Sequence, residues 1–128
     1  MIYLDSSALI KLVVGERESE ALDRHLAGAR HRGSCLLARV EVTRGARKRG
    51  PATLERGRVL LDLLELIAID SPLLVAAAEL EDDRLRSLDA IHVAAALSLG
   101  DDLHELITYD RRMAAAAEDL GLPVFSPA

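Results

Sequence analysis

Four carboxylates stand out by their positions along the chain. Asp5 and Asp110 each follow a short apolar segment of strand-like composition directly, and Glu41 and Asp89 lie near the starts of segments with helical apolar spacing. Like charges about 4 Å apart repel by roughly 4 kcal/mol at an effective dielectric near 20. If these four carboxylates converge in the fold, they therefore need a cation.

The ligand type selects the cation. Hard carboxylate oxygens without Cys or a paired His suit Mg²⁺ or Mn²⁺ far better than zinc. Such an ion binds a phosphodiester oxygen and lowers the pKa of a bound water, so hydrolysis of a phosphodiester is the predicted reaction. Each acid alone also has a simpler interpretation: Asp5 and Asp110 as helix N-caps, Asp89 as a helix-dipole partner, and Glu41 as a solvated helix residue.

Basic side chains gather near Glu41. Residues 39–58 hold seven of the sixteen Lys and Arg residues but only two acids. Glu41, Arg44 and Lys48 recur at i, i+3 and i+7, so they share one helix face. We expect Arg44 and Lys48, together with Arg112 after Asp110, to bind the substrate backbone. A solvated helix surface is the alternative interpretation.

Two hydroxyls and one histidine stand close to the acids. Ser6 follows Asp5 and Thr108 precedes Asp110 by two positions, and we expect both hydroxyls to orient a carboxylate or a bound water. Backbone capping is the alternative for each. His92 lies at i+3 from Asp89 and is interpreted as a structural histidine rather than a ligand.

The elements that must position these residues alternate along the chain. Strands are expected near residues 2–4, 34–37, 67–69, 105–109 and 124–125, and helices over 8–14, 18–29, 38–49, 52–66, 70–80, 88–99 (with Ser87 as its cap) and 110–120. Short strands joined by helices predict an α/β fold with a parallel sheet covered on both faces. Chemistry in such sheets gathers beyond the carboxyl ends of the strands. Asp5 and Asp110 converge there if the first and fourth strands are neighbours.

Composition bounds the class of protein. A chain of 128 residues that is 50% apolar suits a single domain over residues 1–128 with one core. The lone Cys35 excludes an internal disulfide and a thiolate zinc site, which favours a reducing cytoplasm. The sequence shows neither a basic leader before its first apolar residues nor an apolar run of the roughly 18 residues that a membrane span needs. We therefore expect no membrane partner.

The overall charge argues against a general nucleic-acid coat protein. The net charge is -5 and the pI is near 5.3, whereas such domains usually carry a basic surplus. Two Tyr and one Phe are too few for a base-stacking platform. The local basic stretch, and cations bound by the four surplus carboxylates, would offset the charge that faces a nucleic acid.

Taken together, the motifs resemble those of PIN-domain ribonucleases, most closely the VapC toxins of bacterial toxin–antitoxin pairs. Residues 1–12, 39–44, 87–94 and 106–113 are similar to the first to fourth acid motifs of that family, and all four candidate acids match. The resemblance implies a three-layer α/β/α sandwich around a mostly parallel five-stranded sheet of order 3-2-1-4-5.

The same resemblance implies a function. It predicts a Mg²⁺- or Mn²⁺-dependent endoribonuclease that is a homodimer and is inhibited by a VapB-like antitoxin whose tail blocks the acidic site. Residues 8–14 and 21–29, which are rich in Leu and Ala, are the expected grip for the antitoxin.

Two other functions fit some of the residues. Asp5 also has the position of the nucleophile in an aspartyl-phosphate phosphatase, but haloacid-dehalogenase-like phosphatases carry a second Asp two residues later, where this chain has Ser7. A module that binds RNA or protein without cleaving it, with the acids serving as caps, is the other alternative.

Overall fold

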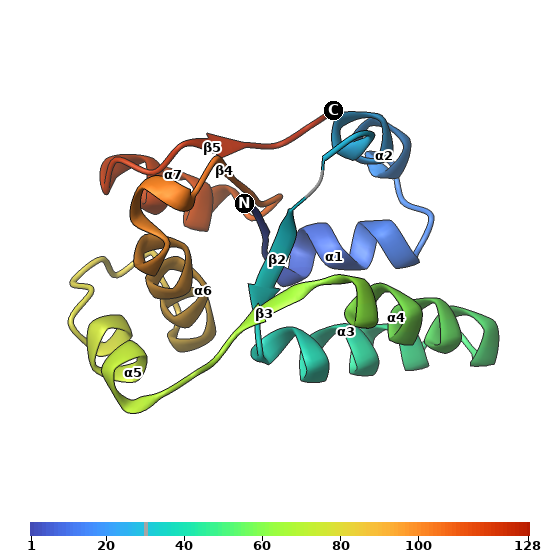
Figure 1. The fold of residues 1–128 in the computed structure, drawn as a ribbon, viewed down its shortest axis with the longest axis horizontal. Coiled ribbons are helices and arrows are strands. Elements are labelled where there is room, and N and C mark those ends of the chain that lie inside the picture. The colour runs from blue at the N-terminus through green and yellow to red at the C-terminus, as the bar shows by residue number, and fades with distance from the viewer. Residues whose placement is uncertain (30) are drawn as a thin grey trace.

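The computed structural model describes residues 1–29 and 31–128 (Figure 1). Its strands are β1 (Ile2–Leu4), β2 (Arg32–Cys35), β3 (Glu65–Ile67), β4 (Glu105–Ile107) and β5 (Val124–Phe125). Its helices are α1 (Ser6–Val13), α2 (Ser19–Leu26), α3 (Leu37–Arg47), α4 (Pro51–Leu63), α5 (Ser71–Ala78), α6 (Ser87–Ser98) and α7 (Arg111–Asp119), with a short 3-10 helix, η1 (Gly100–Asp102). Strands and helices alternate in the predicted α/β manner.

The five strands form one sheet in the order β3-β2-β1-β4-β5, and every pairing is parallel. The predicted fold class and strand order are therefore confirmed. β1 lies at the centre, and Leu4 stands opposite Ile107 in β4. Because parallel strands end at the same edge, the residues that follow β1 and β4 meet there.

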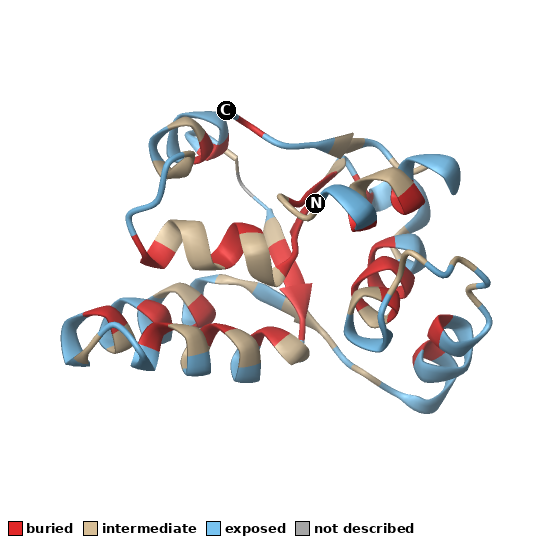
Figure 2. Ribbon diagram, turned by 180° about the vertical axis from the view of Figure 1, so that it is seen from behind, coloured by how far each residue is buried: buried red, intermediate tan, exposed pale blue. Residues whose placement is uncertain are grey.

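The alternation of side chains along β1 divides the core into two layers. Ile2 and Leu4 pack with α1, α2, α3 and α4 on one face, whereas Tyr3 packs with α5, α6 and α7 on the other. Figure 1 shows these two groups of helices on opposite sides of the strands. In Figure 2 the buried residues lie on the strands and on the helix sides that face them. The sheet is thus covered on both faces, as predicted.

The third strand begins earlier than predicted. The apolar run before residue 67 was expected to be helical, but α4 ends at Leu63, and Leu64 is already extended (φ -96°, ψ 145°). Leu66 and Ile67 then pair with Ser34 and Cys35 of β2. A continuous apolar run fits both the helical and the strand periodicity, so pairing with β2 decides which of its residues form the strand.

Two smaller predictions also needed correction. The second strand ends at Cys35 rather than Leu37, and the N-cap of α6 is Arg86 rather than Ser87.

In the described residues, no helix combines the length and the apolar character that a membrane crossing requires.

Candidate functional site at the carboxyl edge of the sheet

Asp5 is buried at the carboxyl end of β1, with 3% of its surface exposed. Its Oδ1 accepts hydrogen bonds from the Ser7 hydroxyl (2.6 Å) and the Ala8 amide (3.0 Å), and its Oδ2 accepts one from the Thr108 hydroxyl (2.5 Å). Burial raises the pKa of Asp5, against these hydrogen bonds, which lower it. The fold therefore holds a carboxylate where its charge is costly.

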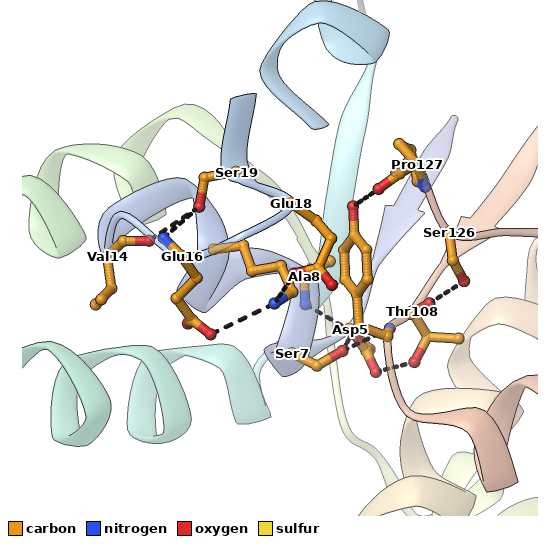
Figure 3. A network of polar contacts seen from close by, with 12 residues as sticks. Asp5, Ser7, Ala8, Val14, Glu16, Glu18, Ser19, Thr108, Ser126 and Pro127 are labelled. Carbon is orange, nitrogen blue, oxygen red and sulfur yellow. Dashed lines mark hydrogen bonds and ion pairs between the residues drawn. The ribbon is translucent and has the colours of Figure 1, made fainter. Parts of the chain in front are cut away.

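Thr108 connects this carboxylate to Asp110. Its Oγ1 accepts the amide hydrogen of Asp110 (3.1 Å) while the hydroxyl donates to Asp5. Figure 3 shows the Thr108 hydroxyl pointing toward Asp5, with Ser126 donating to the Thr108 carbonyl from the other side. The residues after β1 and β4 are thus joined through one side chain.

Ser7, not Ser6, is the hydroxyl that contacts Asp5 on α1. Besides donating to Asp5, Ser7 Oγ accepts the amide hydrogen of Tyr109 at 2.9 Å. The sequence argument named Ser6 because it is adjacent to the acid. Asp5 is the N-cap of α1, and an N-cap side chain turns toward the residues two and three positions later.

Glu41 is held from inside the protein by His92. The Glu41 Oε1 lies 2.7 Å from His92 Nε2, and the Tyr3 hydroxyl lies 2.8 Å from His92 Nδ1. Burial lowers the pKa of His92, but contacts with Cys35 and Glu41 outweigh this effect and raise the pKa to about 10. His92, which the sequence suggested is a structural histidine, is thus buried and also contacts the candidate acid Glu41, a partner that its i+3 spacing from Asp89 did not indicate.

Asp89 and Asp110 both serve as helix-terminal acceptors, as the simpler interpretation proposed. Asp110 is the N-cap of α7, and its Oδ1 accepts hydrogen bonds from the amides of Arg112 and Met113. Asp89 Oδ2 accepts the Arg86 amide hydrogen at the start of α6. These bonds use one oxygen of each carboxylate and do not exclude a second role.

Two hollows open at this edge of the sheet, and residues that contact or follow the Asp5 network line them. One, of about 460 Å³, is lined by Ser7 and Glu41, and the other, of about 390 Å³, is lined by Asp110 and Arg111. Lys11 and Tyr109 border both. A larger hollow of about 600 Å³ between β3, α5 and α6 contains none of the four candidate acids.

Lys11 is fixed at the wall between the two smaller hollows. Its Nζ lies 2.8 Å from Glu18, 3.4 Å from Glu16 and 4.8 Å from the centre of the Tyr109 ring. Figure 3 shows the Glu16 and Glu18 side chains converging there from the segment after α1. Since two glutamates already offset its charge, Lys11 stabilises the wall of the site rather than adding a free cation.

Close packing of α1 against α3 brings Glu41 beside Ser7. A Cβ on Gly45, one turn after Glu41, would lie 2.5 Å from Ile10 Cδ1. A larger residue at this position would therefore require the Ile10 side chain to move. In the described residues, no group of three or more His, Cys, Asp or Glu side chains lies together in a way that could hold a metal ion. The structure thus places Glu41 and Asp110 on adjoining hollows, and Asp5 lies buried behind Ser7, which lines one of them.

The predicted basic face is present on α3. Arg44, Arg47 and Lys48 are exposed and line a shallow hollow of about 410 Å³. Arg112 is exposed at the start of α7. Among the described residues, the arginines that form ion pairs are Arg24, Arg58 and Arg84, and none of them is part of this basic face.

The first two helices, which are the expected binding surface for the antitoxin, have most of their large apolar side chains buried. The apolar residues Leu9, Val13, Leu22 and Leu26 are buried in the core. Large exposed apolar side chains in the described residues lie instead on other elements, including α3, α4, α5 and α6.

A carboxylate-lined edge on a 3-2-1-4-5 parallel sheet is the arrangement found here, and the PIN domain family model matches residues 2–119. The chain belongs to the PIN domain family. It is 48% identical over 126 residues to Ribonuclease VapC46 of Mycobacterium tuberculosis (98% of this chain, 97% of the relative), and 37% identical over 132 residues to Ribonuclease VapC47 of the same species (99% and 97%). A solved structure described as a toxin-antitoxin complex from Klebsiella pneumoniae aligns with TM-score 0.74 and 27% identity, covering 100% of this chain and 98% of that one.

Proposed function

We propose that the protein is a divalent-metal-dependent endoribonuclease, the toxin of a type II toxin–antitoxin pair, acting in the cytoplasm as a single PIN domain. The observation that carries the proposal is Asp5, a buried carboxylate at the carboxyl end of the central strand, held by two hydroxyls and one amide. The ribonuclease names of the VapC relatives support the same reaction.

The residues fit Mg²⁺ or Mn²⁺. Mg²⁺ usually keeps several waters and uses only one or two protein carboxylates directly, so it does not require a closed cage of side chains. A cation beside Asp5 would also offset the cost of its burial. We propose that Asp5, Glu41, Asp89 and Asp110 hold the ion, one or two of them directly and the others through its bound waters; the ion would supply activation of water and charge stabilisation of the phosphodiester.

The protein's own side chains divide the remaining work. The Ser7 and Thr108 hydroxyls fix both oxygens of Asp5, so this carboxylate cannot rotate away from the site. Arg44, Lys48 and Arg112 would bind RNA phosphates, which positions the substrate without reading its bases. Both Asp5 oxygens are engaged inside the protein, an arrangement that suits an oriented ligand better than a covalent nucleophile.

Cleavage of total cellular RNA tests the reaction. Wild-type protein should produce discrete fragments with Mg²⁺ or Mn²⁺ and none with EDTA. Asp5→Asn should lower the rate by on the order of 10²–10³-fold, the equivalent of several kcal/mol of charge stabilisation.

Asp70→Asn is the matched control, because Asp70 caps α5 with the same type of hydrogen bond and lies away from the site. If Asp70→Asn and Asp5→Asn cleave equally well, Asp5 is only a cap. Absence of cleavage by wild-type protein under every condition would favour a module that binds without cutting.

Thermal melting tests the metal site independently of cleavage. Binding to the native state alone raises the melting temperature by mass action. Millimolar Mg²⁺ should therefore stabilise the wild-type protein and Asp70→Asn but not Asp5→Asn. Stability of the wild type that is indifferent to both Mg²⁺ and EDTA would contradict the proposed site.

We also propose a homodimer and a VapB-like antitoxin as partners. Support for an antitoxin comes from the toxin-antitoxin complex that this chain resembles in fold. Exposed apolar side chains available to a partner include Val59 and Leu63 on α4 and Val75 on α5. Sedimentation velocity tests the dimer: a single species at the mass of one chain across the micromolar range would exclude it.

A further inference from the structure

His92 on α6 is almost fully buried, with 2% of its surface exposed, and both ring nitrogens have a partner. Nε2 lies 2.7 Å from Glu41 Oε1, and Nδ1 lies 2.8 Å from the Tyr3 hydroxyl. Tyr3 is itself fully buried in β1, two residues before Asp5. A chain of hydrogen bonds thus joins the central strand to the Glu41 carboxylate through one ring.

The direction of these bonds follows from the chemistry of the groups. An ionised carboxylate only accepts hydrogen bonds, so His92 Nε2 must carry the hydrogen that faces Glu41. In the neutral ring, Nδ1 then accepts from the Tyr3 hydroxyl; in the charged ring it donates to the Tyr3 oxygen. Glu41 receives an N–H in either state, so the contact does not depend on the charge of the ring.

Glu41 lies between the buried His92 ring and one of the two smaller hollows. The Glu41 side chain is 20% exposed and lines the hollow that also holds Ser7, whereas the His92 side chain is 2% exposed. The ring therefore grips the carboxylate from the protein interior while the hollow borders its other side. Carboxylates that bind metals are commonly oriented by a second hydrogen-bonded group of this kind.

We propose that His92 is a positioning residue that orients Glu41 for metal binding, and that Tyr3 fixes the ring. This inference rests on the proposed function, because it needs Glu41 to be a metal ligand. It assigns a role to a buried histidine that the cleavage chemistry itself does not require.

The test is Mn²⁺ binding to the purified protein, measured by electron paramagnetic resonance in the absence of RNA. Two amide variants form a matched pair: the Gln of His92→Gln reaches the place of Nε2 and keeps a donor for Glu41, whereas the Asn of His92→Asn reaches only the place of Nδ1. We expect His92→Asn to lose about 10- to 100-fold in Mn²⁺ affinity. His92→Gln should stay near the wild-type affinity, and Tyr3→Phe should show a smaller loss in the same direction.

A Glu41→Gln background separates positioning from a general loss of structure. If His92 acts through Glu41, His92→Asn should cause no further loss of Mn²⁺ affinity in that background. Equal affinities of folded His92→Asn and wild type, or the same loss in both backgrounds, would overturn the inference while leaving the metal site intact. Wild-type protein that binds no Mn²⁺ would instead overturn the proposed metal site and this inference together.

Discussion

The Asp5 carboxylate and the basic side chains of α3 serve the same proposed reaction, but the protein holds them in opposite ways. Asp5 is buried and fixed by Ser7, Ala8 and Thr108. Arg44 and Lys48 are exposed on a helix surface and border an open hollow. The geometry around Asp5 is fixed before a ligand binds. The basic side chains of α3 can change conformation when a ligand binds.

The difference follows from solvent. Inside the protein the low dielectric makes each hydrogen bond to Asp5 strong and makes any loss expensive. At the surface, water and salt screen a cation, and long side chains keep their freedom. Buried hydrogen bonds can therefore orient a reacting group such as Asp5, whereas exposed cations such as Arg44 and Lys48 are suited to attracting a long polyanion.

Thr108→Val should give the largest loss of stability among these tests. It removes the hydroxyl that donates to Asp5 and accepts from the Asp110 amide, and leaving such buried groups unpaired costs about 1–3 kcal/mol. Urea denaturation measures the free energy of unfolding. Ser126→Ala, which removes one part-buried hydrogen bond to the Thr108 carbonyl at the same sheet edge, should lower it by less, about 0.5–1 kcal/mol. Equal effects of the two variants would remove the contrast between interior and surface.

The double variant Arg44→Ala, Lys48→Ala should leave stability almost unchanged and weaken RNA binding. Each phosphate contact contributes about 0.7 to the slope of log affinity against log salt on single strands, so two lost contacts should flatten this slope by about 1.4. Binding of a single-stranded RNA at several salt concentrations, measured in the slow-cleaving Asp5→Asn background and with EDTA, gives the slope.

Arg24→Ala with Arg58→Ala is the charge-matched control, because both arginines are exposed and pair with neighbouring glutamates. This control should keep the wild-type slope. The same flattening in both double variants would indicate a net-charge effect rather than a basic binding face on α3.

Asp82 tests the smallest effect, at an ion pair near the surface. Arg84 hydrogen bonds to both Asp82 and Asp119. The hydrogen bond from the Arg84 side chain lowers the pKa of Asp82 to about 2. As pH falls, the unfolded chain protonates Asp82 first, so the stabilisation is complete above the ordinary pKa of 3.8 and is lost toward pH 2. The difference in unfolding free energy between wild type and Asp82→Asn should shrink between about pH 5 and pH 2. A difference that is constant over this range would show that the pair does not affect stability through Asp82 ionisation.

The sequence predicted most of the fold and the positions of the acids. Asp5 directly after an apolar strand and Asp110 before an Ala-rich helix gave both the strand ends and the helix starts, because N-cap residues and apolar periods are local signals. The boundary between α4 and β3 was misplaced because its apolar residues fit either period. Ser6 was the expected hydroxyl, whereas Ser7 makes the contact, because adjacency in sequence does not tell which hydroxyl faces the carboxylate.

The sequence by itself determined the alternation of strands and helices, the four acids at the proposed site and the basic stretch around Arg44, because each depends on a local sequence pattern. Only the tertiary structure decided which contacts those residues make. It placed Thr108 against Asp5 across a span of 103 residues and His92 against Glu41 across 51. It also buried the apolar faces of α1 and α2 that the sequence left available to a partner. These outcomes depend on strand order and helix packing, which bring together residues that no local pattern relates.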